Sequence, residues 1–195
     1  MIESGALRKG RCALRELTAI DVAVYRAIAA TPSPTLDSAM SKLSRAADHS
    51  LLWLSIAAAL GLHRGAPRRA AVMGVGSVAI ASATVNIVGK RLLPRSRPDR
   101  LGASVPAARY VRMPTSGSFP SGHAASAFAF AATVGRELPW ASLPLHLLAA
   151  TVAYSRVHTG VHFPADAIVG AVIGAAISSP ATRGILRLRG RCRRR

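Results

Sequence analysis

The sequence has few acidic residues, few aromatic residues and almost no cysteine. Asp and Glu together number 8 against 26 Lys and Arg, which gives a formal net charge of +18 over 195 residues. The two cysteines, Cys12 and Cys192, stand near opposite ends of the chain, which excludes a framework of disulfides and a cysteine-based metal site. Only 5% of the residues are aromatic although 50% are hydrophobic, so Ala, Val, Leu and Ile must form most of the core.

The excess of basic residues alone is compatible with nucleic-acid binding, because clustered cations bind phosphate backbones. Its distribution argues against that function. Arginines gather at the termini and between apolar runs, and the runs themselves contain almost none. Lys and Arg flank membrane-spanning segments and favour the cytoplasmic side. We therefore expect a membrane protein without a nucleic-acid partner.

Five apolar runs are candidates for membrane-spanning helices, because the polar backbone must satisfy its own hydrogen bonds in lipid. They cover residues 50–63, 70–89, 119–135, 138–155 and 165–182. The first falls short of the roughly 20 residues that a crossing needs. In the last, Gly170 and Gly174 predict close helix packing. The predicted fold is all-α, a polytopic transmembrane helical bundle of about five spans, or six if the N-terminal helix also crosses.

The segments outside these runs are basic or amphipathic. Residues 17–30 place apolar side chains at helical spacing beside charged ones, which predicts a helix lying in the membrane interface. The prolines in Thr31-Pro-Ser-Pro34 end it, and a second amphipathic stretch follows at 36–47. We divide the chain into three parts: a basic N-terminal arm at 1–48, a transmembrane domain at 49–182 and an arginine-rich tail at 183–195.

Three short segments carry cations, histidines and an aspartate at the ends of apolar runs. They are Lys90 with Arg97-Pro98, then Pro120-Ser121-Gly122-His123, then Ser155-Arg156 with His162 and Asp166. With five spans, the loops at 90–118 and 155–164 fall on the same side of the membrane, so the segments can converge. Such a set indicates phosphate chemistry, because cations and oriented donors stabilise the charge that spreads over phosphate oxygens.

Each segment alone also has a structural explanation. Lys90 can belong to a solvated basic loop, and Pro-Ser-Gly-His can be an ordinary helix start, whose free N–H groups also favour an anion. Asp166 follows His162 by four residues and shares its helix face. That carboxylate can fix the tautomer of His162 for attack on phosphorus, with His123 as general acid. Equally, it can cap a helix beside an interfacial histidine. The other histidines lack a partner at useful spacing, which favours structural roles for His49, His63, His146 and His158.

Together the three segments resemble the type 2 phosphatidic acid phosphatase (PAP2) superfamily, which also contains vanadium haloperoxidases and bacterial acid phosphatases. The family pattern is Lys-x6-Arg-Pro, Pro-Ser-Gly-His and Ser-Arg-x5-His-x3-Asp, and every position agrees. The resemblance implies that His162 is a phosphohistidine nucleophile, Asp166 its orienting partner and His123 the general acid. It also implies hydrolysis without a metal or other cofactor. The implied phosphate cradle consists of Lys90, Arg97, Ser121, Gly122 and Arg156.

The apolar runs disfavour a soluble acid phosphatase or a haloperoxidase. We expect an integral-membrane phosphatase of a lipid phosphate, phosphatidic acid or similar, because the N-terminal stretch also resembles the phosphatase half of actinobacterial proteins fused to a lipid-kinase domain. One alternative is a polyprenyl (undecaprenyl or decaprenyl) pyrophosphate phosphatase. Another, of a different class, is a non-catalytic lipid-phosphate binder or flippase.

The basic residues away from the motifs predict a cytoplasmic face and hence an extracytoplasmic site in the cell membrane. They are Arg64, Arg68, Arg69, Arg136 and the tail.

Overall fold

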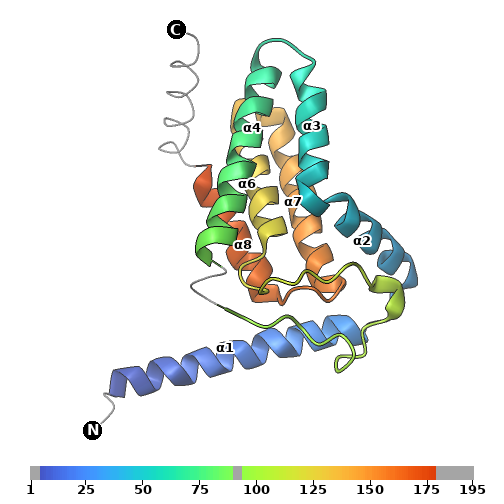
Figure 1. Ribbon diagram of the computed structural model, residues 1–195, viewed down its shortest axis with the longest axis vertical. Helices are drawn as coiled ribbons and strands as arrows, with labels where there is room; N and C mark the ends of the chain where they lie inside the picture. The colour runs from blue at the N-terminus through green and yellow to red at the C-terminus, as the bar shows by residue number, and fades with distance from the viewer. Residues whose placement is uncertain (1–4, 90–93, 179–195) are drawn as a thin grey trace.

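The computed structural model describes residues 5–89 and 94–178, and every regular element within these two ranges is helical (Figure 1). The long helices after residue 50 form a bundle, as the predicted all-α class requires. They are α3 (Leu51–Gly61), α4 (Ala66–Ala83), α6 (Gly122–Glu137), α7 (Pro139–His158) and α8 (Pro164–Ile177). Lys90 and the predicted tail at 183–195 lie outside the described residues.

These helices differ in whether they are long and apolar enough to cross a membrane. Among the described helices, one combines the length and apolarity that a crossing needs: it is Ala66–Ile87, which is α4 with part of its π-helical extension (Thr84–Gly89). α8 is apolar but shorter, and α3 is as short as the sequence suggested. The number of spans therefore stays a prediction.

α6 lies at the centre of the bundle and packs against α4, α7 and α8. Its sequence is rich in alanine, and most of its side chains are buried. The ring of Phe130 meets Trp53 of α3 at a centroid distance of 5.4 Å. A Cβ added at Gly170 of α8 would collide with the backbone of Ser121, directly before α6, and one at Gly174 with the backbone of α6 itself. The predicted close packing at these two glycines is therefore confirmed.

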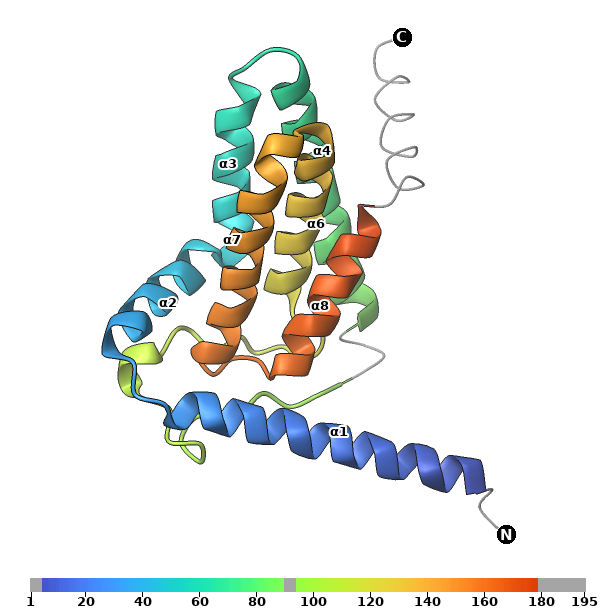
Figure 2. The same ribbon diagram turned by 180° about the vertical axis from the view of Figure 1, so that it is seen from behind.

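The loops at 94–121 and 159–163 lie together at one end of the bundle, which we call the site end (Figures 1 and 2). The α3–α4 hairpin and the α6–α7 corner lie at the other end, with the basic residues expected there: Arg64, Arg68, Arg69 and Arg136. Alternation of helix direction along the chain produces this arrangement, as the sequence predicted.

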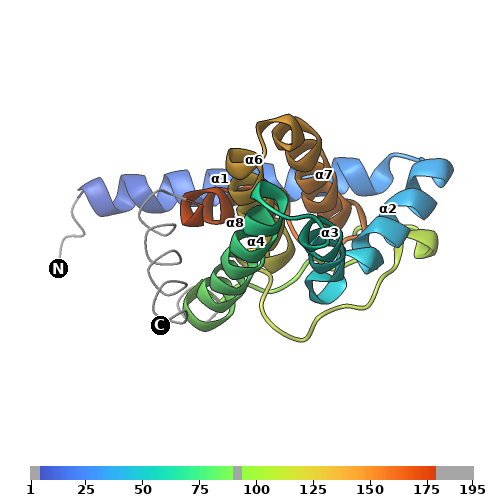
Figure 3. The same ribbon diagram turned by 90° about the horizontal axis from the view of Figure 1, so that it is seen from above.

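The N-terminal helix α1 (Gly5–Ala30) lies across the site end, and its first half projects beyond the bundle (Figures 2 and 3). It begins at Gly5, well before residue 17, at which the helix predicted from apolar periodicity starts. It ends just before the Pro-Ser-Pro segment, as predicted, and α2 (Pro34–Ala46) follows. Asp21 and Tyr25 face the bundle and are buried, whereas Leu17 and Ile20 are exposed. An interfacial location of α1 fits this pattern and stays a prediction.

A buried arginine fixes the corner between α1 and α2 to the loop at 94–121, which we call the long loop. Arg109, in the short helix η3 (Ala107–Arg109), is fully buried and donates through Nε to Asp37 at 2.7 Å. It also donates through Nη2 to the carbonyl oxygen of Thr31 at 2.6 Å. The same Asp37 oxygen lies 2.8 Å from Nε2 of His158. His158 thus has the structural role that was expected, with a partner that sequence spacing could not indicate.

Candidate active site

A cavity of about 250 Å³ opens at the site end, among residues of α3, α4, α6 and the adjoining loops. Residues from all three sequence segments line it: Arg97, Gly122, His123 and His162. Trp53 of α3 and Asn86, in the extension of α4, also line the cavity. The structure therefore brings the three segments together around one space.

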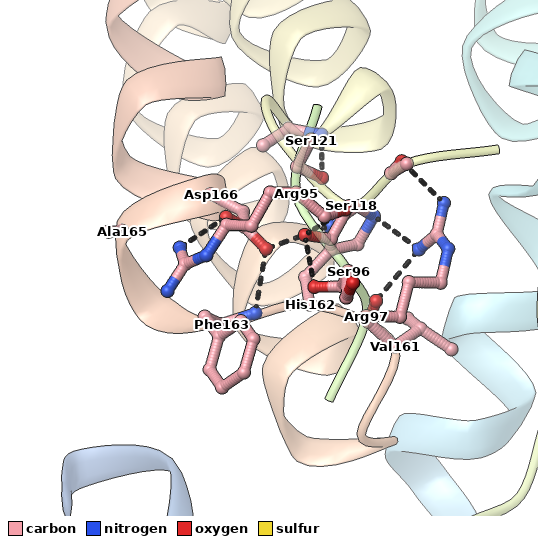
Figure 4. A network of polar contacts seen from close by, with 12 residues as sticks. Arg95, Ser96, Arg97, Ser118, Ser121, Val161, His162, Phe163, Ala165 and Asp166 are labelled. Carbon is pink, nitrogen blue, oxygen red and sulfur yellow. Dashed lines mark hydrogen bonds and ion pairs between the residues drawn. The ribbon is translucent and has the colours of Figure 1, made fainter. Parts of the chain in front are cut away.

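His162 lies directly before α8 and is only 2% exposed. Its Nδ1 faces Oδ2 of Asp166 at 3.5 Å, and its Nε2 lies 3.4 Å from Nη1 of Arg97. Asp166 is held from two other directions, as Figure 4 shows: its Oδ2 accepts the backbone N–H of Phe163 at 2.9 Å, and its Oδ1 accepts Nη1 of Arg95 at 2.7 Å. The two nitrogens of the imidazole are thus placed differently, one toward a carboxylate and one toward a guanidinium.

The imidazole of His162 is neutral at pH 7. Burial lowers its pKa to about 4, and the charges of Arg97 and Arg156 act in the same direction. The neighbouring Asp166 opposes this shift without cancelling it. Only the neutral ring has a lone pair on nitrogen, so the environment provides the form of histidine that can attack phosphorus.

Arg97 joins the long loop to the turn between α7 and α8. Its guanidinium donates to the carbonyl oxygen of Val161 at 2.7 Å (Figure 4). It also donates to the carbonyl oxygens of Ser116 at 2.9 Å and Gly117 at 3.1 Å. Burial lowers the pKa of Arg97, but a guanidinium remains charged at any working pH. A fixed positive charge therefore lines the cavity beside His162.

Arg156, near the end of α7, is 1% exposed and is not among the residues that line the cavity. Its Nη1 donates to Oγ of Ser44 at 2.5 Å and lies 3.4 Å from Oδ1 of Asp48. Within the described part of the chain its Nε has no hydrogen-bond partner. Arg156 thus braces the corner between α2 and α3.

Asp48 is a site residue that the sequence did not indicate. It begins η1 (Asp48–Ser50), and its Oδ1 lies 3.0 Å from Nε2 of His123. His49 and Ser50 follow with backbone φ angles of 54° and 62°. These lie in the left-handed region, which residues other than glycine seldom adopt. Both also line the cavity. Backbone of this kind is common at functional sites, and here it turns the chain so that Asp48 meets His123.

The start of α6 shows a mixed outcome for the predicted cradle. Gly122 lines the cavity. Ser121 is fully buried, and its Oγ accepts the backbone N–H of Ala124 at 3.4 Å, as an N-cap does. Its own backbone N–H donates to the carbonyl oxygen of Asp166 at 2.9 Å, which ties the starts of α6 and α8 together. Contact of Ser121 with phosphate stays a prediction.

Arg95 is a further residue that the motifs did not single out, although it lies two positions before Arg97. It bridges Asp166 and Asp21 of α1, each at 2.7 Å. Among the described residues, no group of three His, Cys, Asp or Glu side chains is arranged to hold a metal ion. Arg97 and Arg156 are the described residues whose positive charge acts on His162.

Comparison with known proteins gives a consistent result. The family model of the PAP2 superfamily matches residues 71–189, which include all three segments. Decaprenylphosphoryl-5-phosphoribose phosphatase of Mycobacterium tuberculosis is 35% identical over 162 residues, 83% of this chain and 86% of its own length. Undecaprenyl-diphosphatase of Sulfolobus acidocaldarius is 42% identical over 66 residues, 33% of this chain and 32% of its own. The crystal structure of Aquifex aeolicus LpxE superposes with a TM-score of 0.66 at 26% identity, covering 80% of this chain and 91% of that one.

Proposed function

The chain belongs to the PAP2 superfamily and is a phosphatase of lipid phosphate esters, and we propose that its substrate is a polyprenyl-linked phosphate. The relatives named above act on decaprenylphosphoryl-5-phosphoribose and on undecaprenyl diphosphate. These names favour the polyprenyl alternative over phosphatidic acid, which depended on a resemblance of the N-terminal stretch alone. We disfavour a non-catalytic binder or flippase, because His123 and His162 line one cavity and Asp166 faces His162.

The relatives suggest two kinds of phosphate, and their coverage separates them. The match to the phosphoribose phosphatase extends over most of both chains, whereas the match to the diphosphatase covers about a third of each. We therefore propose a phosphate monoester on a polyprenyl-phosphoryl sugar as the first substrate class. The pyrophosphate of a polyprenol is the second.

The proposed mechanism uses His162 as nucleophile. Its Nε2 forms a bond to phosphorus while the bond from phosphorus to the leaving oxygen breaks. His123 donates a proton to that oxygen, and Asp48 beside it favours the protonated imidazole that this step needs. In the second step His123 takes a proton from water, the water oxygen bonds to phosphorus, and the P–N bond breaks to release inorganic phosphate.

The charges around the cavity serve both steps. Asp166 faces Nδ1 of His162, so it stabilises the positive charge that the ring gains as the P–N bond forms. The guanidinium of Arg97 lines the cavity, and the charges of Arg97 and Arg156 both act on His162, which supports their proposed role in stabilising the phosphate oxygens. Gly122, at the N-terminus of α6, adds a helix end that favours an anion. The single observation that carries the proposal is the placement of Nε2 of His162 beside Arg97 in one cavity with His123.

We further propose that the protein is a multi-pass membrane protein whose site end is extracytoplasmic. The basic residues of the α3–α4 hairpin and the α6–α7 corner lie at the opposite end, where the cytoplasm is expected. α1 then lies along the outer surface of the membrane, with its exposed apolar residues Leu17 and Ile20 toward lipid.

The function is tested by phosphate release from a panel of lipids in detergent. We expect the purified protein to prefer decaprenylphosphoryl-5-phosphoribose over undecaprenyl pyrophosphate, and both over phosphatidic acid. His162→Ala should abolish release and retain lipid binding. Release from phosphatidic acid alone would refute the polyprenyl proposal, and full activity of His162→Ala would refute the mechanism. A wild-type protein that binds these lipids without releasing phosphate would indicate a binder or flippase.

A further inference from the structure

Asp21 of α1 reaches the phosphate site although it lies outside all three motifs. Its Oδ2 lies 2.7 Å from Nη2 of Arg95, and its Oδ1 accepts the backbone N–H of Ala165 at 2.8 Å. Asp21 is only 7% exposed, whereas the side chain of Arg95 remains partly exposed. The carboxylate on this amphipathic helix therefore holds the start of α8, where a free backbone N–H needs an acceptor.

Arg95 extends this contact to the partner of the nucleophile. Its Nη1 donates to Oδ1 of Asp166 at 2.7 Å, and its guanidinium lies 4.2 Å from the centroid of the Phe163 ring (Figure 4). Asp166 in turn faces Nδ1 of His162. Asp21, Arg95, Asp166 and His162 thus follow one another as carboxylate, guanidinium, carboxylate and imidazole.

Tyr25 brings a second contact from the same face of α1. It lies one helical turn after Asp21, is 3% exposed, and meets Phe163 edge to face at a centroid distance of 5.4 Å. The backbone N–H of Phe163 is one of the two donors that hold Asp166. α1 therefore supports the His162–Asp166 turn through a charged contact and through an aromatic one.

The charges of Arg95 and Asp166 explain why a second carboxylate, that of Asp21, is useful beside them. Attack on phosphorus makes the ring of His162 positive, and Asp166 must keep enough negative charge to stabilise it. Arg95 paired with Asp166 alone would neutralise that charge. With Asp21 on its other side, Arg95 still orients Asp166 through a hydrogen bond, and the three groups together keep one net negative charge.

We propose that Asp21 and Arg95 are positioning residues of the phosphatase site, which hold Asp166 against Nδ1 of His162 in the correct orientation and charge state. The N-terminal helix then contributes to the chemistry as well as to the predicted contact with the membrane. The inference rests on the proposed phosphohistidine mechanism, and it concerns residues that the family motifs do not include.

The first test is Asp21→Asn, which keeps the shape of the side chain and removes its charge. We expect kcat to fall about 10- to 100-fold with KM changed less than about twofold, because small misplacements of reacting groups can cost about 100-fold. Arg95→Lys should show a similar loss, because an ammonium keeps the charge and loses the planar fork that spans two carboxylates. If only one of these variants folds, the other still carries the test.

The chain offers a matched control in Asp37→Asn. Asp37 is as deeply buried as Asp21 and also pairs with an arginine of the long loop at 2.7 Å, but it contacts neither Asp166 nor His162. We expect Asp37→Asn to lower thermal stability and to leave kcat within about twofold of the wild type. An equal loss of kcat in both variants would show that Asp21 acts only through stability.

A spectroscopic measurement separates this inference from the proposed function. In protein with ¹⁵N-labelled histidine, with the His162 signals assigned through His162→Gln, the wild type should show the Nδ1–H tautomer of His162. Asp21→Asn should give a mixture of tautomers, and Asp37→Asn should not. An unchanged tautomer together with wild-type kcat in Asp21→Asn overturns the inference. A wild-type protein that hydrolyses no lipid phosphate overturns the proposed function instead, and the tautomer measurement still decides the role of Asp21.

Discussion

Oδ1 of Asp48 lies 3.0 Å from Nε2 of His123, and the same oxygen lies 3.4 Å from Nη1 of Arg156. Partial burial by itself raises the pKa of Asp48. The hydrogen bond with His123 and the charge of Arg156 outweigh that effect, so the pKa lies below its ordinary value. Asp48 is therefore ionised at neutral pH and stabilises the protonated imidazole that a general acid requires.

We expect Asp48→Asn to lower kcat in proportion to how much the leaving group needs a proton. With a lipid or sugar phosphate the loss should approach the factor of about 100 or more that a general acid contributes. With an aryl phosphate, whose leaving oxygen is a weak base, it should be several-fold smaller. Steady-state kinetics with both substrate types provide the measurement.

The control for this prediction is Asp99→Asn, which changes an exposed carboxylate in the loop at the same end of the molecule. Asp99 accepts the backbone N–H of Leu101 at 3.0 Å and does not line the cavity. We expect less than about a twofold change in kcat. An equal loss for lipid and aryl phosphates in Asp48→Asn would contradict a role for Asp48 in proton donation.

The buried His162 predicts how stability varies with pH. In the unfolded chain its imidazole has an ordinary pKa near 6.5, whereas burial lowers the pKa in the folded protein to about 4. Between these values the unfolded state binds more protons, so stability decreases as the pH falls from about 6.5 to about 4 and this contribution is constant below. The thermal unfolding midpoint in detergent should decrease less steeply over that window in His162→Gln. Parallel curves for the two proteins would mean that His162 is not buried in its neutral form.

Phosphate release should not depend on an added metal ion. The PAP2 resemblance implies metal-independent hydrolysis, and in the described structure Arg97 and Arg156 provide positive charge around His162. We expect the same kcat before and after dialysis against EDTA, measured beside a magnesium-dependent phosphatase that loses its activity. Restoration by a divalent ion after such a loss would require a different mechanism.

Much of the site was predictable because the motif residues stand at helix ends. Helix length and alternating direction decide which ends meet, so the convergence of His123, His162 and Arg97 follows from the spacing of the apolar runs. The supporting carboxylates were not predictable in this way. Asp48 meets His123 across 75 residues of chain, and Asp21 meets Arg95 across 74. No local pattern marks contacts of that kind.

Asp21 shows how a sequence pattern can mislead. Within residues 17–30 the charged residues beside apolar ones predicted a helix lying in the membrane interface, and nothing in the pattern indicated that Asp21 is buried. In the structure the carboxylate is buried, because Arg95 and the N-terminus of α8 satisfy it. The helix α1 also begins earlier than the helix predicted at 17–30, because the residues before 17 carry helix-forming side chains without clear apolar periodicity. In α1 the periodic apolar residues Leu17 and Ile20 are exposed, and the face that packs against the bundle carries Asp21 and Tyr25. Hydrophobic periodicity alone therefore does not identify the packed face of this helix.

The glycines of α8 provide a test of the packing that brings the motifs together. Gly170 lies against the carbonyl of Ser121, and Gly174 lies against that of Ala125. We expect Gly170→Ala and Gly174→Ala each to cost about 1–3 kcal/mol, because the helices must separate to admit a methyl group. Gly61→Ala is the control: at the end of α3 an added Cβ meets nothing within 4 Å, and the replacement should be neutral or stabilise by up to about 1 kcal/mol.

The two α8 variants should differ in activity. Gly170 is one helical turn from Asp166, and the Ser121 that it touches donates its backbone N–H to Asp166. Moving α8 away at this level shifts His162 relative to His123, so Gly170→Ala should lose more kcat than Gly174→Ala at a similar loss of stability. Thermal unfolding and phosphate release, measured on the same detergent samples, decide the matter. Wild-type stability in both variants would show that α6 and α8 do not approach as closely as the structure indicates, and the shared cavity would lose its structural basis.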